Sequence, residues 1–285
     1  MNNKRVILEE LEGYRKEALK WTTITIVTFA IGALLAITGF FFLVLVGIIP
    51  AIISGKKNKE FKMRYKNYFL ASQFEEVFET PVNVDLSGYS ESKIKNSYLI
   101  PEGNRFYSDD LISLEYKGVK INRGDVTIQT VTSTGKTTTT VTNFQGQYMV
   151  FSFPKNITEF MVIKENAFFG NKPGGMFSNC PKTSKVEFES IEFNKMFDVY
   201  ASNEHEAFYL LTPQFMQVIM DFRKKNSHEV YFGFMNNEFH VAVNTGKNLF
   251  EPSILKSVTT SDSEFDKGHI YDLKDMIEQF RLMEE

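Results

Sequence analysis

The sequence predicts an α+β protein: an N-terminal two-helix transmembrane hairpin, followed by a domain of mainly antiparallel strands packed with helices. Three observations support this prediction. Residues 21–55 contain no charged residue, residues 90–154 alternate between apolar and polar side chains, and helical spacing returns near the C-terminal end. We therefore expect a lead helix at 1–20, a hairpin at 21–55, a stalk helix at 56–80 and an α+β domain at 81–285.

The uncharged run at 21–55 is too long for one membrane span. As a single helix it would be about 50 Å long at 1.5 Å per residue, whereas the hydrocarbon core of a bilayer is about 30 Å thick. Gly39 divides the run into two short apolar segments, so we expect two helices with a turn at Gly39. Trp21 is placed as an interfacial anchor, and Pro50 as a tolerated kink in the second helix.

Both flanks of this run are basic, and cations close to a span stay on the cytoplasmic side. Two crossings keep both flanks inside, so we expect a multi-pass plasma-membrane protein with both termini in the cytoplasm. A signal peptide, a re-entrant loop and a hairpin buried in a soluble core remain as alternatives. The cations are Lys4, Arg5, Arg15, Lys16 and Lys20 before the run, and Lys56, Lys57, Lys59, Lys62, Arg64 and Lys66 after it.

Composition narrows the class of partner. The net charge of -3 and the pI near 5.9 give no electrostatic case for nucleic acid. The single cysteine, Cys180, excludes an internal disulfide framework and fits a reducing compartment. The bilayer itself is the first partner that the sequence predicts.

The alternating region predicts two hairpins. The first turns at Lys117 and Gly118. The second pairs Asp125–Thr132 with Thr137–Phe153 and reverses at residues 133–136. Its tip is almost all threonine, which can be extended but has little apolar surface to bury. The tip is therefore either a projecting β-arm or a flexible loop.

The remaining elements follow in order. A strand is expected at Phe160–Lys164, a Gly/Pro-rich loop with exposed or tucked aromatics at Gly170–Ser184, and short strands at 186–188 and 197–200. Helices are expected at 203–211, from Thr212 as N-cap to about Lys225, and at 271–284.

A hairpin around Asn236 and Asn237 has a predictable register. This pair tolerates positive φ and suits a two-residue type I′ turn. The turn places apolar residues opposite one another on one face, which we expect to be core, and His240 on the other face. The predicted pairs are Phe234 with Phe239, Phe232 with Val241, and Val230 with Val243.

Motifs for chemistry are incomplete. Gly135-Lys136-Thr137 lacks the first glycine of a phosphate-binding loop, because Thr130 stands there, and it leads into a strand. His205-Glu206 lacks a second histidine at Tyr209, so no metal site is predicted. Cys180 has no base beside it in sequence. We therefore predict no cofactor, no metal and no identifiable catalytic residue.

The C-terminal motifs resemble those of the bacterial domain-of-unknown-function family 3137 over roughly residues 60 to 282. The resemblance implies a bacterial membrane-anchored domain facing the cytoplasm, often encoded near LemA-like membrane proteins, which makes such a protein a candidate partner. It implies no accepted activity. The motifs are Phe144-Gln145-Gly146-Gln147-Tyr148, the run Glu192–Tyr200, the run Glu206–Met216, and Leu249-Phe250-Glu251-Pro252.

Within these motifs, Asn194, Glu206 and Glu251 are polar residues embedded in apolar runs, and they are the candidate binding residues. The competing interpretation gives them capping or turn roles. The hypothesis is a membrane-anchored domain that binds another protein; the alternative is a membrane-bound enzyme acting on a lipid or envelope precursor. Core positions are expected at Phe193, Phe197, Tyr200, Phe208, Leu210 and Leu211.

Overall fold

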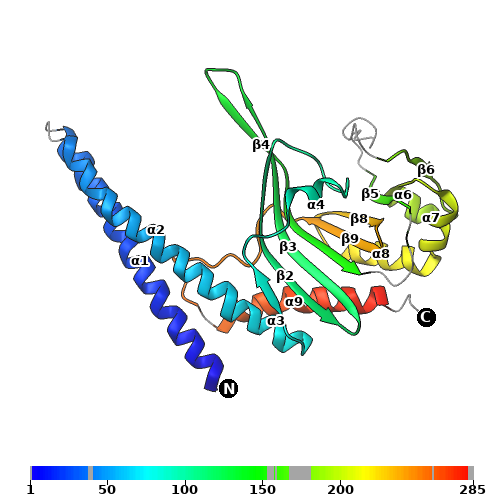
Figure 1. The fold of residues 1–285 in the computed structure, drawn as a ribbon, viewed down its shortest axis with the longest axis horizontal. Helices are drawn as coiled ribbons and strands as arrows, with labels where there is room; N and C mark the ends of the chain where they lie inside the picture. Colours follow the sequence, from blue (N-terminus) through cyan, green and yellow to red (C-terminus); the bar gives the residue numbers. More distant parts are fainter. Residues whose placement is uncertain are drawn as a thin grey trace. The chain divides into compact units, whose positions relative to one another are not determined.

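The computed structural model describes residues 2–37, 41–152, 157, 159–166, 181–258 and 260–281. The chain divides into two units. Unit 1 is Met1–Glu79 with Phe250–Tyr271, and unit 2 is Thr80–Leu249 with Asp272–Glu285. Unit 1 begins with an apolar helix and unit 2 contains a large antiparallel sheet (Figure 1), which confirms the predicted α+β class.

The N-terminal helix of unit 1 is uninterrupted. α1 runs from Asn2 to Ile37 and includes both the expected lead helix and the first apolar segment. In the described part of the chain, one helix, Val6–Ile37, is long and apolar enough to cross a membrane; a signal sequence would pass the same test. A second membrane span is not shown.

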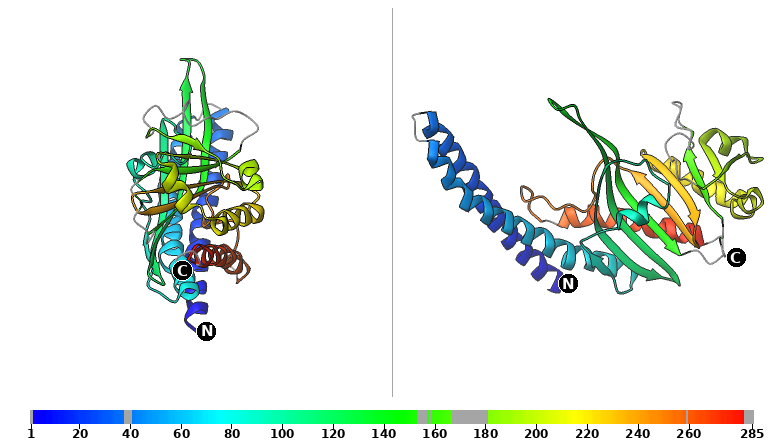
Figure 2. Two further views of the ribbon diagram at one scale, coloured as in Figure 1. Left: turned by 90° about the vertical axis from the view of Figure 1, so that its right-hand side faces the viewer. Right: turned by 45° about the horizontal axis from the view of Figure 1, so that its top comes forward.

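The returning segment is divided into a 3-10 helix, η1 (Phe41–Gly47), and α2 (Ile48–Arg64), which run back along α1 (Figures 1 and 2). The predicted turn at Gly39 lies outside the described residues. Trp21 lies within α1. Pro50 falls in the first turn of α2, where its missing N–H breaks no helical hydrogen bond.

Polar and close-packed contacts fix the register of α1 against the returning segment. Thr22 Oγ1 lies 2.9 Å from Ser54 Oγ, and Asn58 donates to Thr22 Oγ1 at 3.2 Å. Farther along, a Cβ added to Gly47 would lie 3.0 Å from the Phe29 ring, so glycine permits the close approach there.

The expected stalk helix continues from α2 through a π-helical segment, η2 (Tyr65–Leu70), and α3 (Ala71–Phe78). It ends at Glu79, which has a φ of 54°, two residues before Pro81. Its aromatic residues are buried except Tyr68, and the Phe74 ring packs edge-on against Phe250, at 5.8 Å between centroids.

Unit 2 is built on a nine-stranded antiparallel sheet in the order β1-β2-β3-β4-β9-β8-β5-β7-β6. Strands that follow one another in sequence are paired from β1 through β4, and β8 is paired with β9. β5 lies between β7 and β8 in the sheet and pairs with both, although β8 is distant from it in sequence. The strands are β1 (Asn83–Asp85), β2 (Arg105–Tyr116), β3 (Val119–Ser133), β4 (Thr138–Ser152), β5 (Met161–Glu165), β6 (Ser184–Val186), β7 (Phe197–Ala201), β8 (Glu229–Met235) and β9 (Glu238–Asn244).

Short helices of unit 2 begin at side-chain caps, as in the predicted Thr212 cap, whose hydroxyl accepts from the Phe215 N–H at 3.2 Å. The last helix starts earlier than predicted, at Thr260, because residues 260–270 carry little apolar periodicity in the sequence. The helices are α4 (Glu91–Lys95), α6 (Ile191–Met196), α7 (Glu204–Leu210), α8 (Pro213–Lys225) and α9 (Thr260–Arg281).

The hairpin register is confirmed. Asn236 and Asn237 have φ values of 53° and 59°, and the three predicted cross-strand pairs of β8 and β9 are formed. Lys117 and Gly118 also turn at positive φ, which confirms the β2–β3 hairpin. The Phe239 ring packs 4.6 Å from Phe234 in the aromatic core.

Two predictions about burial need correction. Phe208 was expected in the core but is 45% exposed, because α7 buries Ala207 and Leu210 instead; the Phe208 ring packs against Phe188, at 5.0 Å between centroids. Tyr200 is only partly buried. Most of the Gly170–Ser184 loop, including Cys180, lies outside the described residues.

Candidate functional site

The predicted residue Asn194 has a local structural role. Its side-chain amide donates to the Phe188 carbonyl at 2.6 Å and its oxygen accepts from the Phe188 N–H at 3.2 Å. Both halves of the amide therefore close the turn that precedes α6. This is the turn role that competed with a binding role.

Glu206 lies in the first turn of α7, two residues after the helix begins. The side chain of Asn203 caps this helix, accepting from His205 N and Glu206 N. A carboxylate in a first turn is stabilised by the helix dipole. Its position is therefore explained by helix formation in unit 2.

Glu251 belongs to unit 1, where two lysines hold it. Its carboxylate accepts from Lys62 Nζ at 2.7 Å and forms an ion pair with Lys66, a buried lysine. Burial alone would raise the pKa of Glu251, but the two lysines outweigh it and lower that pKa. Asn194 and Glu206 lie in unit 2, so the three predicted residues are not assembled into one described site.

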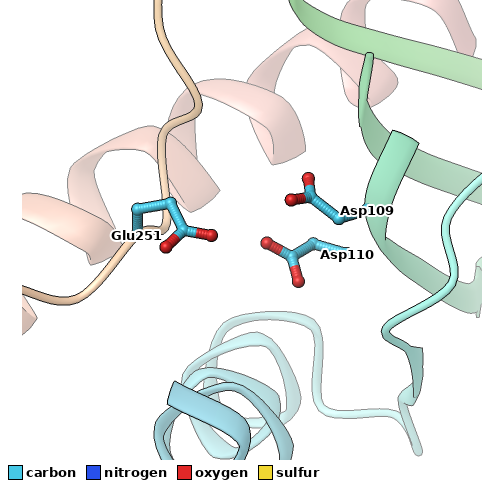
Figure 3. A group of neighbouring side chains, drawn as sticks. All are labelled: Asp109, Asp110 and Glu251. Atoms are coloured by element: carbon cyan, nitrogen blue, oxygen red, sulfur yellow. The ribbon is translucent and has the colours of Figure 1, made fainter. Parts of the chain in front are cut away.

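Two further acids, Asp109 and Asp110, follow one another on β2 in unit 2, and Figure 3 draws their side chains. The β2–β3 register shifts between Asp109 and Ile112, and Asp110 has a φ of 56°. Asn248 donates to Asp109 Oδ1 at 3.4 Å. Because of this irregularity, Asp109 and Asp110 do not follow the usual alternation of side chains between the two faces of a strand.

A buried ion pair lies on the neighbouring strand β3, where Asp125 stands opposite Asp109. Arg123 donates to both oxygens of Asp125, at 2.6 and 3.3 Å, and to Gln147 Oε1 at 3.2 Å. Both side chains are almost fully buried. Because a buried charge must be paired, this arrangement serves packing of the sheet, and periodicity alone did not reveal it. In the sequence, the signal is a cation and an acid two residues apart in a strand, which places both side chains on the same face of the sheet.

The opposite face of the sheet carries a chain of polar contacts from the surface inward. Lys93 on α4 pairs with Glu238, whose carboxylate lies 3.2 Å from His240 Nε2; His240 Nδ1 lies 2.9 Å from the Tyr148 hydroxyl. His240 thus points away from the aromatic core face, as predicted, but it is buried under the segment that contains α4.

Electrostatics assign the protons in this network. Burial lowers the pKa of His240, so the imidazole is neutral at pH 7. Burial also favours protonated Glu238, but contacts with His240 and Lys93 outweigh it and lower its pKa to about 2. The consistent tautomer has Nε2–H facing Glu238 and Tyr148 donating to Nδ1. Tyr148 is fully buried, so the network joins α4 to the sheet and offers no accessible nucleophile.

A small cavity in unit 2 lies between α4, the segment 100–103 and strands β2 and β3. Its volume of about 10 Å³ gives room for roughly one water molecule. A substrate of ordinary size does not fit this cavity. The lining residues are Ile94, Lys95, Ile100, Pro101, Glu102, Gly103, Phe106 and Ile128.

The outer part of the β3–β4 hairpin, which we call the arm (residues 130–142), is the most exposed paired structure in unit 2. Residues 132–142 are all exposed. The two strands remain in register from Thr130–Val141 to Ser133–Thr138, and Gly135 turns at a φ of 82°. The tip is therefore a β-arm rather than a flexible loop (Figure 1).

The arm has open strand edges. β2 pairs with β3 only as far as Gln129, and β9 pairs with β4 only from Gln147 onward. Asn104 occupies one position on the β3 edge, donating to Val131 O and accepting from Val131 N, both at 2.8 Å. On the edge of β4 that faces away from β3, no strand of the described residues pairs between Thr138 and Asn143.

Comparisons with known proteins give a family and one slight structural likeness. A family model described as "Protein of unknown function (DUF3137)" matches residues 142–284. The crystal structure of the mycobacterial trehalose monomycolate transport factor A, TtfA, is similar over 76% of this chain and 96% of that chain, at 8% identity and a TM-score of 0.38. No curated protein matches the sequence.

Proposed function

This chain belongs to the DUF3137 family of proteins of unknown function, and from that premise we propose that it is a membrane-anchored protein whose unit 2 binds a protein partner through the arm. The observation that supports this proposal is the open edge of β4 along an ordered ribbon. Ordering a ribbon costs conformational entropy, and this one buries little of its own surface in return. A partner would supply the missing contacts.

The edge defines what the partner presents. Exposed backbone N–H and C=O groups of a strand pair best with another extended segment, a mode known as β-augmentation. The open stretch of β4 from Thr138 to Asn143 is about 20 Å long at 3.3 Å per residue. Its side chains are mostly threonine, and Lys136 is the one charged residue on the arm, so backbone hydrogen bonds would dominate the contact.

A photocrosslinking amino acid at Val141, in the full chain in native membranes, tests this proposal. Val141 and Tyr107 are both 55% exposed on strands of unit 2, so Tyr107 is the matched control position. We expect a specific protein adduct from position 141 and none from 107. A LemA-like membrane protein is the partner class to probe first, as the family resemblance implies.

A variant with a shortened arm provides a second, independent test. Replacing residues 131–140 with Asn-Gly joins Thr130 to Val141, which already face each other, through a two-residue turn. Unit 2 should keep its stability, because the removed residues are mostly exposed. Adducts that persist at full yield in this variant, or adducts with the protein itself alone, would refute a role of the arm.

We also propose that both termini face the cytoplasm and that η1 and α2 form a second crossing. The support is the exposure of apolar side chains on η1 (Leu45) and α2 (Ile49), as on the end of α1 (Leu34 and Ile37). Cys180 is the chain's single thiol. A membrane-impermeant maleimide should label Cys180 weakly in intact cells and strongly after lysis and unfolding. A Thr139→Cys variant in a Cys180→Ser background should give the same result. Strong labelling of intact cells would overturn the orientation.

An enzyme acting on a lipid or cell-envelope precursor has less support. The Asn194 amide is occupied by Phe188, the Glu251 carboxylate by two lysines, and the Tyr148 hydroxyl is buried. Glu206→Ala and Glu251→Ala variants that remain folded but change the membrane lipid profile would favour that alternative.

A further inference from the structure

We infer that four exposed lysines on α1 and α2 (Lys16, Lys20, Lys56 and Lys59, the lysine belt) bind the headgroups of anionic phospholipids. The inference rests on the membrane anchoring proposed above and adds the chemical class of lipid that the anchor selects. All four lysines belong to unit 1.

The structure separates the basic residues near the apolar segment into two groups. Most of them are neutralised by acids of the same unit, so they offer no net charge to a ligand. These pairs are Arg15 with Glu12, Lys57 with Glu17 and Glu60, Arg64 with Glu10 and Glu60, and both Lys62 and Lys66 with Glu251.

The lysine belt is the second group. Its four side chains are exposed, and among the described residues their ammonium groups make no hydrogen bond or ion pair. The acids Glu10, Glu12, Glu17 and Glu60 are already engaged by other cations. Among the cations near the apolar segment whose side chains the structure describes, the belt lysines are therefore the ones without an ion pair, and Lys16 acts on Glu12 only through a longer-range charge interaction.

The helix register brings the four lysines of the belt to two adjacent levels along the helix pair. The contacts Thr22–Ser54 and Glu17–Lys57 set α1 against α2, and in that register Lys20 lies level with Lys56 and Lys16 level with Lys59. The two levels are about 6 Å apart along the helix at 1.5 Å per residue. The headgroup layer on one side of a bilayer is also about 5–7 Å thick.

An apolar surface begins directly beyond the belt. Trp21 follows Lys20 and Gly55 precedes Lys56, and apart from Thr23, whose hydroxyl bonds the Leu19 carbonyl, the exposed side chains farther along both helices are apolar, among them Ile26 and Ile52. A cationic ring beside an apolar surface is complementary to the phosphate layer of an anionic leaflet. Each lysine near such a surface favours binding roughly fivefold.

Trp21 provides the measurement, because it is the single tryptophan of the chain and adjoins the belt. The full chain is reconstituted into phosphatidylcholine bilayers with a small fraction of brominated lipid, whose bromine quenches nearby tryptophan. We expect brominated phosphatidylglycerol to quench Trp21 roughly two- to fivefold more effectively than brominated phosphatidylcholine at equal mole fraction. The ratio should fall toward one at high salt, which screens exposed charges.

The variant K16Q/K20Q/K56Q/K59Q should bring this ratio to about one while Trp21 remains quenched by both lipids. The matched control, K182Q/K195Q/K225Q/K247Q, removes the same charge from exposed lysines of unit 2 and should keep the native ratio. A ratio of one in the native chain, or an unchanged ratio in the belt variant, would overturn the inference.

Two further outcomes separate this inference from other readings. If neither lipid quenches Trp21, membrane anchoring itself has failed, which is distinct from failure of the belt. If inorganic phosphate at matched ionic strength abolishes the preference where chloride does not, the belt binds a free anion and the assignment to lipid headgroups is wrong.

Discussion

Glu238→Gln tests whether the polar network holds α4 to the sheet of unit 2. The substitution keeps the shape of the side chain but removes the charge that faces both Lys93 and His240. The glutamine amide can still make one neutral hydrogen bond. The predicted loss of stability is therefore electrostatic and must depend on pH.

The magnitude follows from the pKa of Glu238. A drop from 4.5 to about 2 corresponds to at most about 3 kcal/mol at 1.36 kcal/mol per pKa unit. Glu238 is 28% exposed and Lys93 40% exposed, so solvent screening reduces this to about 1–2 kcal/mol. Because the folded pKa is lowered, the contribution is complete above about pH 4.5 and is lost as the pH falls toward 2.

Hydrogen exchange of β9 amides measures this in the full chain in detergent micelles, corrected for intrinsic rates at each pH. We expect the native chain to be about 1–2 kcal/mol more stable than Glu238→Gln at pH 7, with a smaller difference at pH 3. Glu91→Gln is the control, because the Glu91–Lys95 pair is about half exposed and contributes below about 0.5 kcal/mol. A difference that is the same at both pH values, or no larger than the control, would refute the reasoning.

Three other substitutions probe unit 2. We expect stability to fall below about pH 6.5, because burial makes the native imidazole of His240 resist a proton that the unfolded chain accepts. His240→Gln should flatten this fall, as measured by urea titrations at several pH values. Gly146→Ala should destabilise by about 1–3 kcal/mol in thermal melts, since its Cβ would lie 2.0 Å from the Val243 carbonyl oxygen. Phe239→Ala should cost about 3–5 kcal/mol, measured by urea midpoints, because the ring contacts four other phenylalanines.

Each of these has a control at an open position. His205→Gln is exposed and should leave the pH profile unchanged. Gly13→Ala meets no atom within 4 Å and should stabilise α1 by about 0.5–1 kcal/mol. Val141→Ala should stay within about 0.5 kcal/mol of the native chain. A destabilised Gly13 variant, or a Gly146 variant with native stability, would contradict the packing argument.

Local chemistry made part of this fold predictable. The β8–β9 register follows from two asparagines that accept positive φ and from apolar residues at matching distances from the turn. The Thr212 cap followed from the residue types around a helix start. Such signals lie within a few residues of one another, so one sequence is enough to detect them.

Contacts between segments that are distant in sequence could not be predicted from such local signals. That β5 lies between β8 and β7 depends on which edges remain open after the hairpins form. The burial of His240 depends on α4, which lies about 145 residues earlier, as the Lys93–Glu238 separation shows. The sequence also does not distinguish the lysines of the belt from nearby lysines that form ion pairs. Lys62 and Lys66, for example, pair with Glu251, which comes close to them only in the folded chain.

The π-helical segment η2 has a consequence for how this protein can change over evolution. A π-helical turn holds about one residue more than an α-helical turn, so the loss of one residue within Tyr65–Leu70 can be taken up by a return to ordinary α-helical turns. The wide turn is thus a place where the chain can change length while the helical turns on either side keep their angular phase. A chain that is one residue shorter here would keep the same stalk and still present the same side chains to Phe250.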